Sequence, residues 1–184
     1  MNKKLYKESI ILIGPSGAGK STVAEELRKI TNMPRLCLDG VANTARAKGL
    51  AKKFKSEDEF NCCMISEVLK SVKEHNEYGI VDFGAGHSVY DDVSIFGDVK
   101  EMLQPFENIV LLLPSEDEQE ALKIMKQRST GGTRHNQKFF ESPCNRELAT
   151  MTVYENGRIP SEVAEEIITR IKEREESKIS SKKR

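Results

Sequence analysis

An apolar run, a glycine-rich turn and a helical pattern follow one another near the start of the chain. The apolar run is Ile10–Ile13, which is typical of a buried parallel strand. Residues 14–21, GPSGAGKS, fit the pattern G-x-x-x-x-G-K-[ST] at every fixed position. From Ser21 to Ile30, apolar side chains recur at helical spacing. This order constrains the fold more than any other feature, because it predicts a strand, a tight loop and a helix that packs back on a parallel sheet.

The same segment predicts a binding site for a nucleotide triphosphate. Glycines allow successive backbone N–H groups to turn inward and form a concave nest for an anion. Lys20 adds a cation for the β- and γ-phosphates, and the Ser21 hydroxyl suits Mg²⁺. The start of the following helix directs its positive dipole end at the same anion. The residues expected to bind the nucleotide are Gly14, Pro15, Ser16, Gly17, Ala18, Gly19, Lys20, Ser21, Thr22 and Arg128.

Strand and helix patterns alternate along the rest of the chain. Four further strands are predicted at Arg35–Leu38, Gly79–Phe83, Asn108–Leu113 and Met151–Tyr154. A helical stretch that Gly49 interrupts is predicted from about Val41 to Phe54. Further helices are predicted at Glu57–Asn76, from a capping box of Ser115 and Glu118 to Arg128, and from Pro160 onward. This alternation predicts a three-layer α/β fold with a mostly parallel sheet, in a single domain that spans residues 1–184.

Composition argues against several classes of protein. The 184 residues include 29 Lys and Arg and 29 Asp and Glu, so bulk charge does not attract nucleic acid. No apolar run is long enough to span a membrane, and residues 1–8 lack the apolar region of a signal peptide. The four cysteines lack zinc-binding spacing and are expected to be reduced. We expect a cytoplasmic monomer or homodimer without a membrane or nucleic-acid partner.

Polar and glycine residues follow the second and third predicted strands, at the sheet edge where parallel sheets bind ligands. Asp39 is the expected acceptor-side carboxylate of a phosphoryl transfer, with a helix cap as the alternative. Asp82 is expected in the water shell of Mg²⁺, with a structural hydrogen bond as the alternative, because an unpaired carboxylate inside an apolar strand is costly. Gly84-Ala85-Gly86 is expected to let the backbone approach a substrate, with a plain turn as the alternative, and His87 to contact that substrate.

The segment 129–147 is polar and lacks a helical or strand period. Long loops in compact domains are usually functional, so we expect a lid over the nucleotide, with a solvated loop as the alternative. Arg134 within this segment and Arg128 just before it are candidates for contacts to the phosphates. The polar, basic tail at 177–184 is expected to fray.

Together these segments resemble the shikimate kinases, small P-loop kinases of the nucleoside-monophosphate-kinase type, over nearly the whole chain. Asp39 stands where that family has the second aspartate of an Asp-x-Asp motif. Gly84-Ala85-Gly86 matches the family's triple-glycine substrate loop in place, with Ala85 instead of the middle glycine. Residues 148–153 and 160–164 resemble the closing strand and the last helix. The resemblance implies the strand order 2-3-1-4-5 and a mobile lid, with ATP and Mg²⁺ as cofactors.

The departures from the family lie in the segments that would bind the acceptor. Cys37 replaces the first aspartate of the Asp-x-Asp pair, and Asn61 follows Phe60 where the family has an arginine for the shikimate carboxylate. A second such arginine is replaced by Glu141 or a near neighbour. Losing a bidentate arginine costs a few kcal/mol, and an acid repels a carboxylate. We therefore expect that shikimate is not the acceptor and that a cationic or polyhydroxyl compound is.

The sequence thus predicts ATP- and Mg²⁺-dependent phosphoryl transfer to a hydroxyl of a small molecule. Lys20, Asp39 and Arg134 are the expected catalytic residues. Ser21 and Asp82 are expected at the metal, with Asp39 as the alternative to Asp82 in its water shell. Two other functions stay open: a kinase for nucleosides, nucleotides or polynucleotide ends, and an ATP-binding regulatory protein without catalysis.

Overall fold

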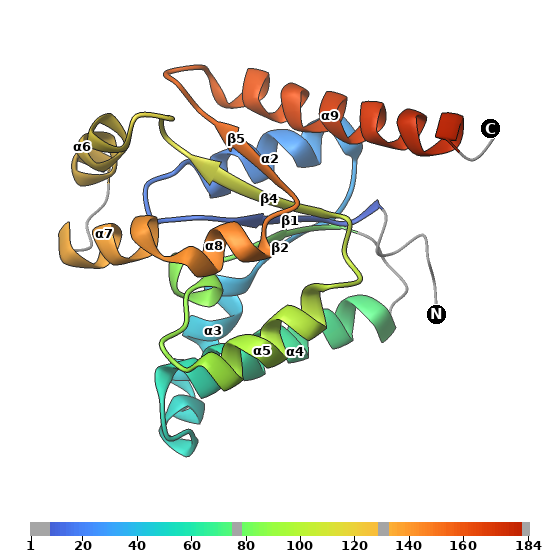
Figure 1. Cartoon of the computed structure of the whole chain (residues 1–184). Coiled ribbons are helices and arrows are strands. Elements are labelled where there is room, and N and C mark those ends of the chain that lie inside the picture. The colour runs from blue at the N-terminus through green and yellow to red at the C-terminus, as the bar shows by residue number, and fades with distance from the viewer. Residues whose placement is uncertain (1–7, 75–78, 129–132, 182–184) are drawn as a thin grey trace.

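The computed structural model describes residues 8–74, 79–128 and 133–181, and these centre on a five-stranded sheet (Figure 1). The strands are β1 (Ile10–Ile13), β2 (Arg35–Cys37), β3 (Ile80–Asp82), β4 (Asn108–Leu113) and β5 (Met151–Tyr154). Their order is β2-β3-β1-β4-β5, and each neighbouring pair is parallel. The predicted fold class and strand order are confirmed.

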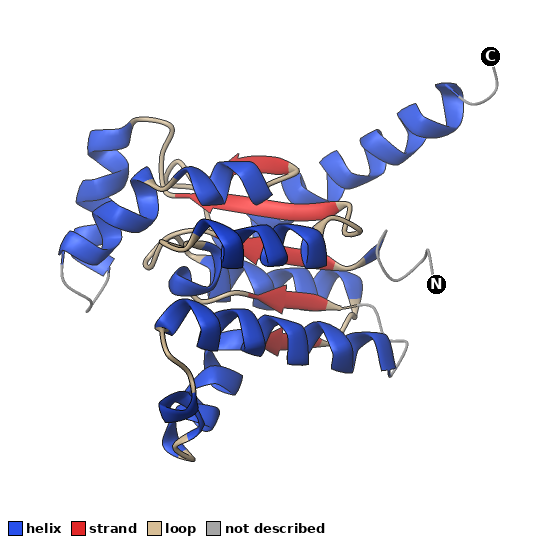
Figure 2. Cartoon of the chain, turned by 60° about the horizontal axis from the view of Figure 1, so that its bottom comes forward, coloured by secondary structure: helices blue, strands red, loops and turns tan. Residues whose placement is uncertain are grey.

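Helices cover both faces of this sheet, as Figure 2 shows. On one face lie α2 (Lys20–Thr31) and α9 (Pro160–Ser181); on the other lie α3 (Leu38–Ala47), α4 (Glu57–Glu74), α5 (Val93–Leu103) and α8 (Pro143–Leu148). Ile10 and Leu12 of β1 join the core under α2 and α9, whereas Ile11 and Ile13 join the core on the opposite face. Because successive strand residues point to opposite faces, β1 is buried on both, which explains its uniformly apolar sequence.

The predicted strands agree with the observed ones to within one residue at each end, but the helix after β2 differs. The helical stretch predicted from about Val41 to Phe54 begins earlier than expected, because Leu38 already starts α3, which ends at Ala47. The predicted interruption at Gly49 is confirmed. Gly49, with φ of 75°, then starts a short 3-10 helix, η1 (Leu50–Lys53). Glycine favours this left-handed conformation, and it separates the two helical segments. As a consequence, Asp39 lies within the first turn of α3 and not in a turn before it.

The helix after β4, α6 (Glu118–Arg128), ends where the sequence predicts but has a different cap. Asp117 Oδ1 accepts a hydrogen bond from the backbone N of Glu120 at 2.8 Å. Ser115 Oγ accepts one from the backbone N of Asp117 at 3.1 Å. The predicted capping box of Ser115 and Glu118 is therefore wrong. Ser115 instead shapes the turn that brings the Asp117 carboxylate to the helix start, where the dipole favours it.

The segment 129–147 is helical in its described part, contrary to the predicted loop. Residues 129–132 lie outside the described residues, and α7 (Thr133–Glu141) and α8 follow. The side chain of Ser142 caps α8 by accepting a hydrogen bond from the backbone N of Cys144 at 3.3 Å. Phe140 and Cys144 are buried against the core, and this packing stabilises the two helices. The polar composition of the segment gave no helical pattern from which they could be predicted.

The last helix extends further than the sequence suggested. The predicted frayed tail at 177–184 is wrong for residues 177–181, which continue α9, and residues 182–184 lie outside the described residues. Ser177 Oγ and Ser180 Oγ donate to backbone oxygens one turn back, at 2.8 and 3.0 Å. In the described part of the chain, no helix is both long enough and apolar enough to cross a membrane.

Candidate active site

Three glycines shape the loop between β1 and α2. Gly14, Gly17 and Gly19 have φ values of 135°, 81° and 76°, which side chains rarely allow. A Cβ on Gly14 would lie 2.4 Å from the backbone oxygen of Leu112, so no side chain fits there. Gly19 is the N-cap of α2, and among the described residues no side chain caps this helix and no acid stands in its first turn. The helix start therefore offers N–H groups and a positive dipole end to an anion.

The side chain of Lys20 lies folded along this loop. Its Nζ donates to the backbone oxygens of Gly14 and Pro15 at 2.8 and 2.9 Å, and the residue is 8% exposed. Burial lowers the pKa of Lys20, and the charges of Asp82 and Asp39 act against that effect. These two backbone oxygens thus hold the Lys20 ammonium group beside the anion nest. Phosphate oxygens of a bound nucleotide can take their place as its hydrogen-bond acceptors. The loop fits a triphosphate in its conformation and its charge.

A cleft of about 420 Å³ opens over the loop. Its lining includes Ser16, Lys20, Asp39, Ala85, Arg128 and Glu155. The phosphate loop, the residue after β2 and the loop after β3 were singled out from separate parts of the sequence. The fold brings them together at the carboxyl ends of β1, β2 and β3, where parallel sheets bind ligands.

Asp39 reaches from α3 to the loop after β3 and packs directly on Gly84. A Cβ on Gly84 would lie 1.8 Å from Asp39 Oδ1, so this contact requires glycine. The Asp39 side chain is 56% exposed and lines the cleft. The N-cap of α3 is Cys37, so the alternative that Asp39 merely caps a helix is wrong. The carboxylate is therefore available to a molecule in the cleft.

His87 lies beside Asp39, in the 3-10 helix η2 (Ala85–Ser88) that follows Gly84. Its side chain is 3% exposed, and its Nδ1 is 3.5 Å from Asp39 Oδ1. Burial lowers the pKa of His87, although the Asp39 carboxylate acts in the opposite direction. Among the described residues, neither ring nitrogen has a hydrogen-bond partner of good geometry. Sequence reasoning named His87 as a substrate contact; the structure places it behind the carboxylate.

Asp82 ends β3 and is buried against Arg35 of β2. Arg35 Nη2 donates to Asp82 Oδ2 at 2.7 Å, and Glu25 of α2 lies 3.9 Å from the same guanidinium. This ion pair supplies the structural hydrogen bond that the sequence left as an alternative. Asp82 pairs with Leu12 of β1 in the sheet, which places it near the phosphate loop that follows β1. Its part in a Mg²⁺ shell stays a prediction.

Asn61 occupies the position at which the family resemblance predicts a substrate-binding arginine. In this structure its side chain makes structural hydrogen bonds instead. It is 3% exposed; its Nδ2 donates to the backbone oxygen of Gly86 at 3.2 Å, and its Oδ1 accepts from Arg46 Nη2 at 3.4 Å. Arg46 also pairs with Glu57 and lies over the Phe60 ring, 4.7 Å from its centroid. Asn61 therefore fixes the loop after β3. Sequence reasoning missed Arg46, because no motif marks it.

Arg128 and Glu155 form the opposite wall of the cleft. Arg128, at the end of α6, pairs with Glu155, whose side chain is 7% exposed. A Cβ on Gly19 would lie 3.1 Å from Glu155 Oε1, so this carboxylate sits against the phosphate loop. Sequence reasoning missed Glu155, although its place directly after β5 was a usable signal. Arg134 lies on α7, and its side chain is outside the described part of the chain.

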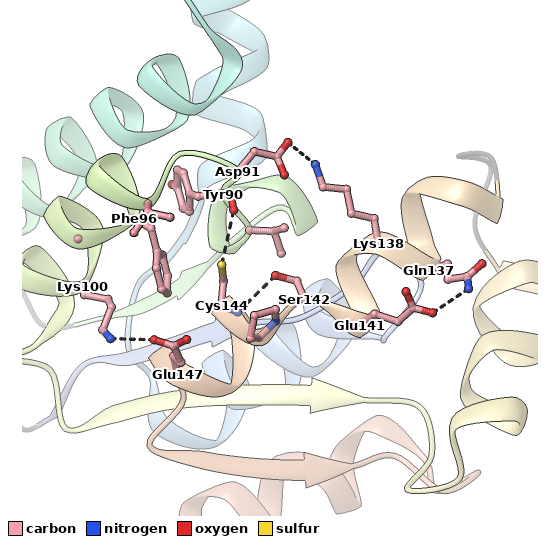
Figure 3. A pocket seen from close by; sticks show the side chains of 14 residues that line it. Tyr90, Asp91, Phe96, Lys100, Gln137, Lys138, Glu141, Ser142, Cys144 and Glu147 are labelled. Atoms are coloured by element: carbon pink, nitrogen blue, oxygen red, sulfur yellow. Dashed lines mark hydrogen bonds and ion pairs between the residues drawn. The ribbon is translucent and has the colours of Figure 1, made fainter.

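A larger cavity of about 780 Å³ lies between α5, α7 and α8 (Figure 3). Glu141 lines this cavity and accepts a hydrogen bond from Gln137 Nε2 at 2.7 Å. An ion pair of 2.6 Å between Lys138 and Asp91 joins α7 to the segment before α5. Glu141 is not among the residues that line the cleft over the phosphate loop, as far as the chain is described.

Comparison with known proteins relates the chain to small-molecule kinases. The shikimate kinase of Rhodococcus jostii is 25% identical over 183 residues, which cover 89% of this chain and 97% of that protein. The shikimate kinase of Enterococcus faecalis is 27% identical over 177 residues, which cover 90% and 99%. No family model matches the sequence.

Solved structures share the fold. A shikimate kinase from Acinetobacter baumannii in complex with shikimate has a TM-score of 0.68 at 18% identity, and covers 94% of this chain and 98% of its own. A gluconokinase from Sinorhizobium meliloti has a TM-score of 0.63 at 16% identity, and covers 96% and 98%. Over most of its length the chain is thus similar in sequence to shikimate kinases and shares the fold of small-molecule kinases, as the sequence predicted.

Proposed function

We propose that this protein transfers the γ-phosphoryl group of ATP, bound with Mg²⁺, to a hydroxyl group of a small molecule. The observation that carries the proposal is that one cleft of about 420 Å³ contains both an anion nest and an exposed carboxylate. Similarity to shikimate kinases over most of the chain supports it. Asp39, packed on Gly84 and exposed to the cleft, supplies the carboxylate that the acceptor side of such a reaction needs.

The chain's residues divide between the two halves of the reaction. Lys20 and the backbone N–H groups at the start of α2 hold the phosphates, and the Ser21 hydroxyl holds Mg²⁺ with Asp82 in its water shell. Mg²⁺, when bound, neutralises the negative charge that the phosphates carry. Asp39 orients the acceptor hydroxyl and takes its proton. Arg134 contacts the phosphates from the lid.

The acceptor in this proposal is a polyhydroxyl or cationic compound and not shikimate. Asn61 carries no charge, and both ends of its amide are engaged by Gly86 and Arg46. Glu141 is an acid that lines the other cavity. At these two positions a carboxylate therefore finds no arginine to bind it in a bidentate clamp, and hydroxyl groups are recognised by neutral hydrogen bonds instead.

ADP release in the presence of ATP and MgCl₂ tests this function with a panel of acceptors. The panel contains shikimate, gluconate, neutral sugars and polyols, and cationic amino alcohols; Lys20→Ala protein, purified in parallel, controls for contaminating kinases. We expect kcat/KM for the best polyhydroxyl or cationic acceptor to exceed that for shikimate at least about a hundredfold, the effect of a lost bidentate contact. Efficient turnover of shikimate would contradict the acceptor assignment. Stabilisation by ATP without turnover of any acceptor would favour a regulatory nucleotide-binding protein.

A further inference from the structure

We propose that His87 is a positioning residue, which holds the Asp39 carboxylate toward the acceptor hydroxyl through a hydrogen bond from its Nδ1–H. The inference rests on the proposed function, in which Asp39 is the acceptor-side carboxylate. The two atoms concerned, His87 Nδ1 and Asp39 Oδ1, are 3.5 Å apart, so a small adjustment brings them to hydrogen-bond distance. The imidazole lies on the protein side of the carboxylate, buried, whereas Asp39 is open to the cleft.

The His87 ring is held in place by its surroundings. Its backbone N donates to Gly84 O at 3.0 Å, and its backbone oxygen accepts from Tyr90 Oη at 3.0 Å. The ring packs edge-on against Phe83, with 6.5 Å between the ring centroids. With both backbone groups bonded and the ring enclosed, the imidazole cannot turn toward solvent. Nδ1 therefore stays close to Asp39 Oδ1.

The His87 ring can supply a hydrogen-bond donor to the Asp39 carboxylate beside it. Among the described residues, neither nitrogen of the His87 ring has a hydrogen-bond partner of good geometry, although the backbone of Gly84 is near enough to act on the pKa of the ring. Burying a polar group without a partner costs free energy, so the presence of an imidazole here needs a reason. A general base, in turn, depends on its direction, because a displacement of about 1 Å costs on the order of a hundredfold in rate. A hydrogen bond between the two satisfies both requirements.

The charge state of the ring suits this role. The charges that act on His87 are Asp39 and Arg46 from α3 and Glu57 from α4. Burial lowers the pKa of His87, so the ring is neutral at neutral pH and a single nitrogen carries a proton. Asp39 selects Nδ1 for that proton. A neutral donor orients the carboxylate without placing a full positive charge beside the base.

Nitrogen-15 spectra of the full-length protein, labelled at its three histidines, report which ring nitrogen carries the proton. The signals of His87 are assigned as those lost in His87→Gln. We expect the Nδ1–H tautomer in the unsubstituted protein and a shift toward Nε2–H in Asp39→Ala. Asp98→Ala, which removes an exposed carboxylate on α5, should leave the tautomer unchanged. An Nε2–H ring in the unsubstituted protein, or the same tautomer in Asp39→Ala, overturns the proposal without reference to activity.

Two substitutions separate positioning from packing. The amide nitrogen of Asn lies near the place of Nδ1, and that of Gln lies near the place of Nε2. With the best acceptor of the panel, we expect kcat to fall on the order of a hundredfold in His87→Gln and about tenfold or less in His87→Asn, with the KM for ATP unchanged. A pure packing role predicts the reverse order, because Gln fills more of the ring's volume, and that order would refute the proposal. If the unsubstituted protein phosphorylates no acceptor, the proposed function fails while the tautomer measurement still decides whether His87 contacts Asp39.

Discussion

The donor half and the acceptor half of the cleft are built in different ways. The donor half is one continuous segment, residues 14–21, whose glycine conformations and free helix start form a nest from backbone groups. The acceptor half is lined from separate elements, by Asp39 of α3 and by Phe83 and Ala85 after β3. Asn61 of α4 and His87 of η2 lie buried behind this lining. A backbone nest changes little with the surrounding sequence, whereas each side chain of the acceptor half can be exchanged. The side chains of the acceptor half can therefore change while the donor half stays the same.

Lys20→Ala tests the donor half and has the largest expected effect. Loss of the cation at the phosphates should lower phosphoryl transfer about a thousandfold. It should also abolish stabilisation by ATP, which reaches about 2.7 kcal/mol when ATP is at a hundred times its Kd. Thermal unfolding with and without ATP measures the second effect. The control is Lys29→Ala, in the same helix, whose side chain pairs with Glu26 at the surface; stabilisation that survives in Lys20→Ala would show that nucleotide binds elsewhere.

Arg35→Ala tests the ion pair that supports the sheet edge between the two halves. It leaves the Asp82 carboxylate buried without its partner, and we expect a loss of about 3 kcal/mol, at the lower end for buried pairs because Arg35 is partly exposed. Urea unfolding followed by circular dichroism measures it. Lys123→Ala, which removes a surface pair with Glu120, should cost less than about 0.5 kcal/mol. Equal losses of unfolding free energy in the two variants would mean that the ion pair between Arg35 and Asp82 does not stabilise the fold.

Gly84→Ala separates the acceptor half from the donor half. The backbone of Gly84, with φ of −65° and ψ of 155°, accepts alanine, so only the Cβ 1.8 Å from Asp39 Oδ1 is disturbing. Displacement of Asp39 should lower kcat on the order of a hundredfold and leave stabilisation by ATP intact. Gly97→Ala is the matched control, because a Cβ there meets open space and alanine favours the helix. If Gly84→Ala also abolishes ATP binding, the halves are not independent.

Arg128→Ala has the smallest expected effect and tests the wall of the donor half. Arg128 lines the cleft and pairs with Glu155, so its loss removes a cation and leaves a buried carboxylate near the phosphates. We expect the Kd for ATP to rise about tenfold, which corresponds to roughly 1.4 kcal/mol of binding free energy, while the KM for the acceptor stays the same. Isothermal titration with a non-hydrolysable ATP analogue measures the affinity. Lys126→Ala on the same helix serves as the control; an unchanged affinity in Arg128→Ala would restrict Arg128 to a structural pair.

Local patterns were sufficient to predict most of the fold. The apolar runs of β1 and β4 are buried on both faces, and the period of α4 places Phe60, Met64 and Leu69 in the core. The helices α7 and α8 could not be predicted in this way. Their polar composition hides the few side chains, such as Phe140 and Cys144, whose burial stabilises them. That burial depends on the cover that the neighbouring helices provide, which no local pattern contains.

The phosphate loop followed from local sequence alone, because its glycines dictate the backbone conformation and all of its groups are contiguous. Local sequence also pointed to Asp39 and Gly84, through their places after strands. Only the tertiary structure decided that these two residues touch, that Arg35 neutralises Asp82 from 47 positions away, and that Asn61 is engaged by the fold. The physical reason is that these are contacts between side chains on different elements. Their existence depends on the pairing of β2 with β3 and on the packing of α3 and α4, and not on any local preference.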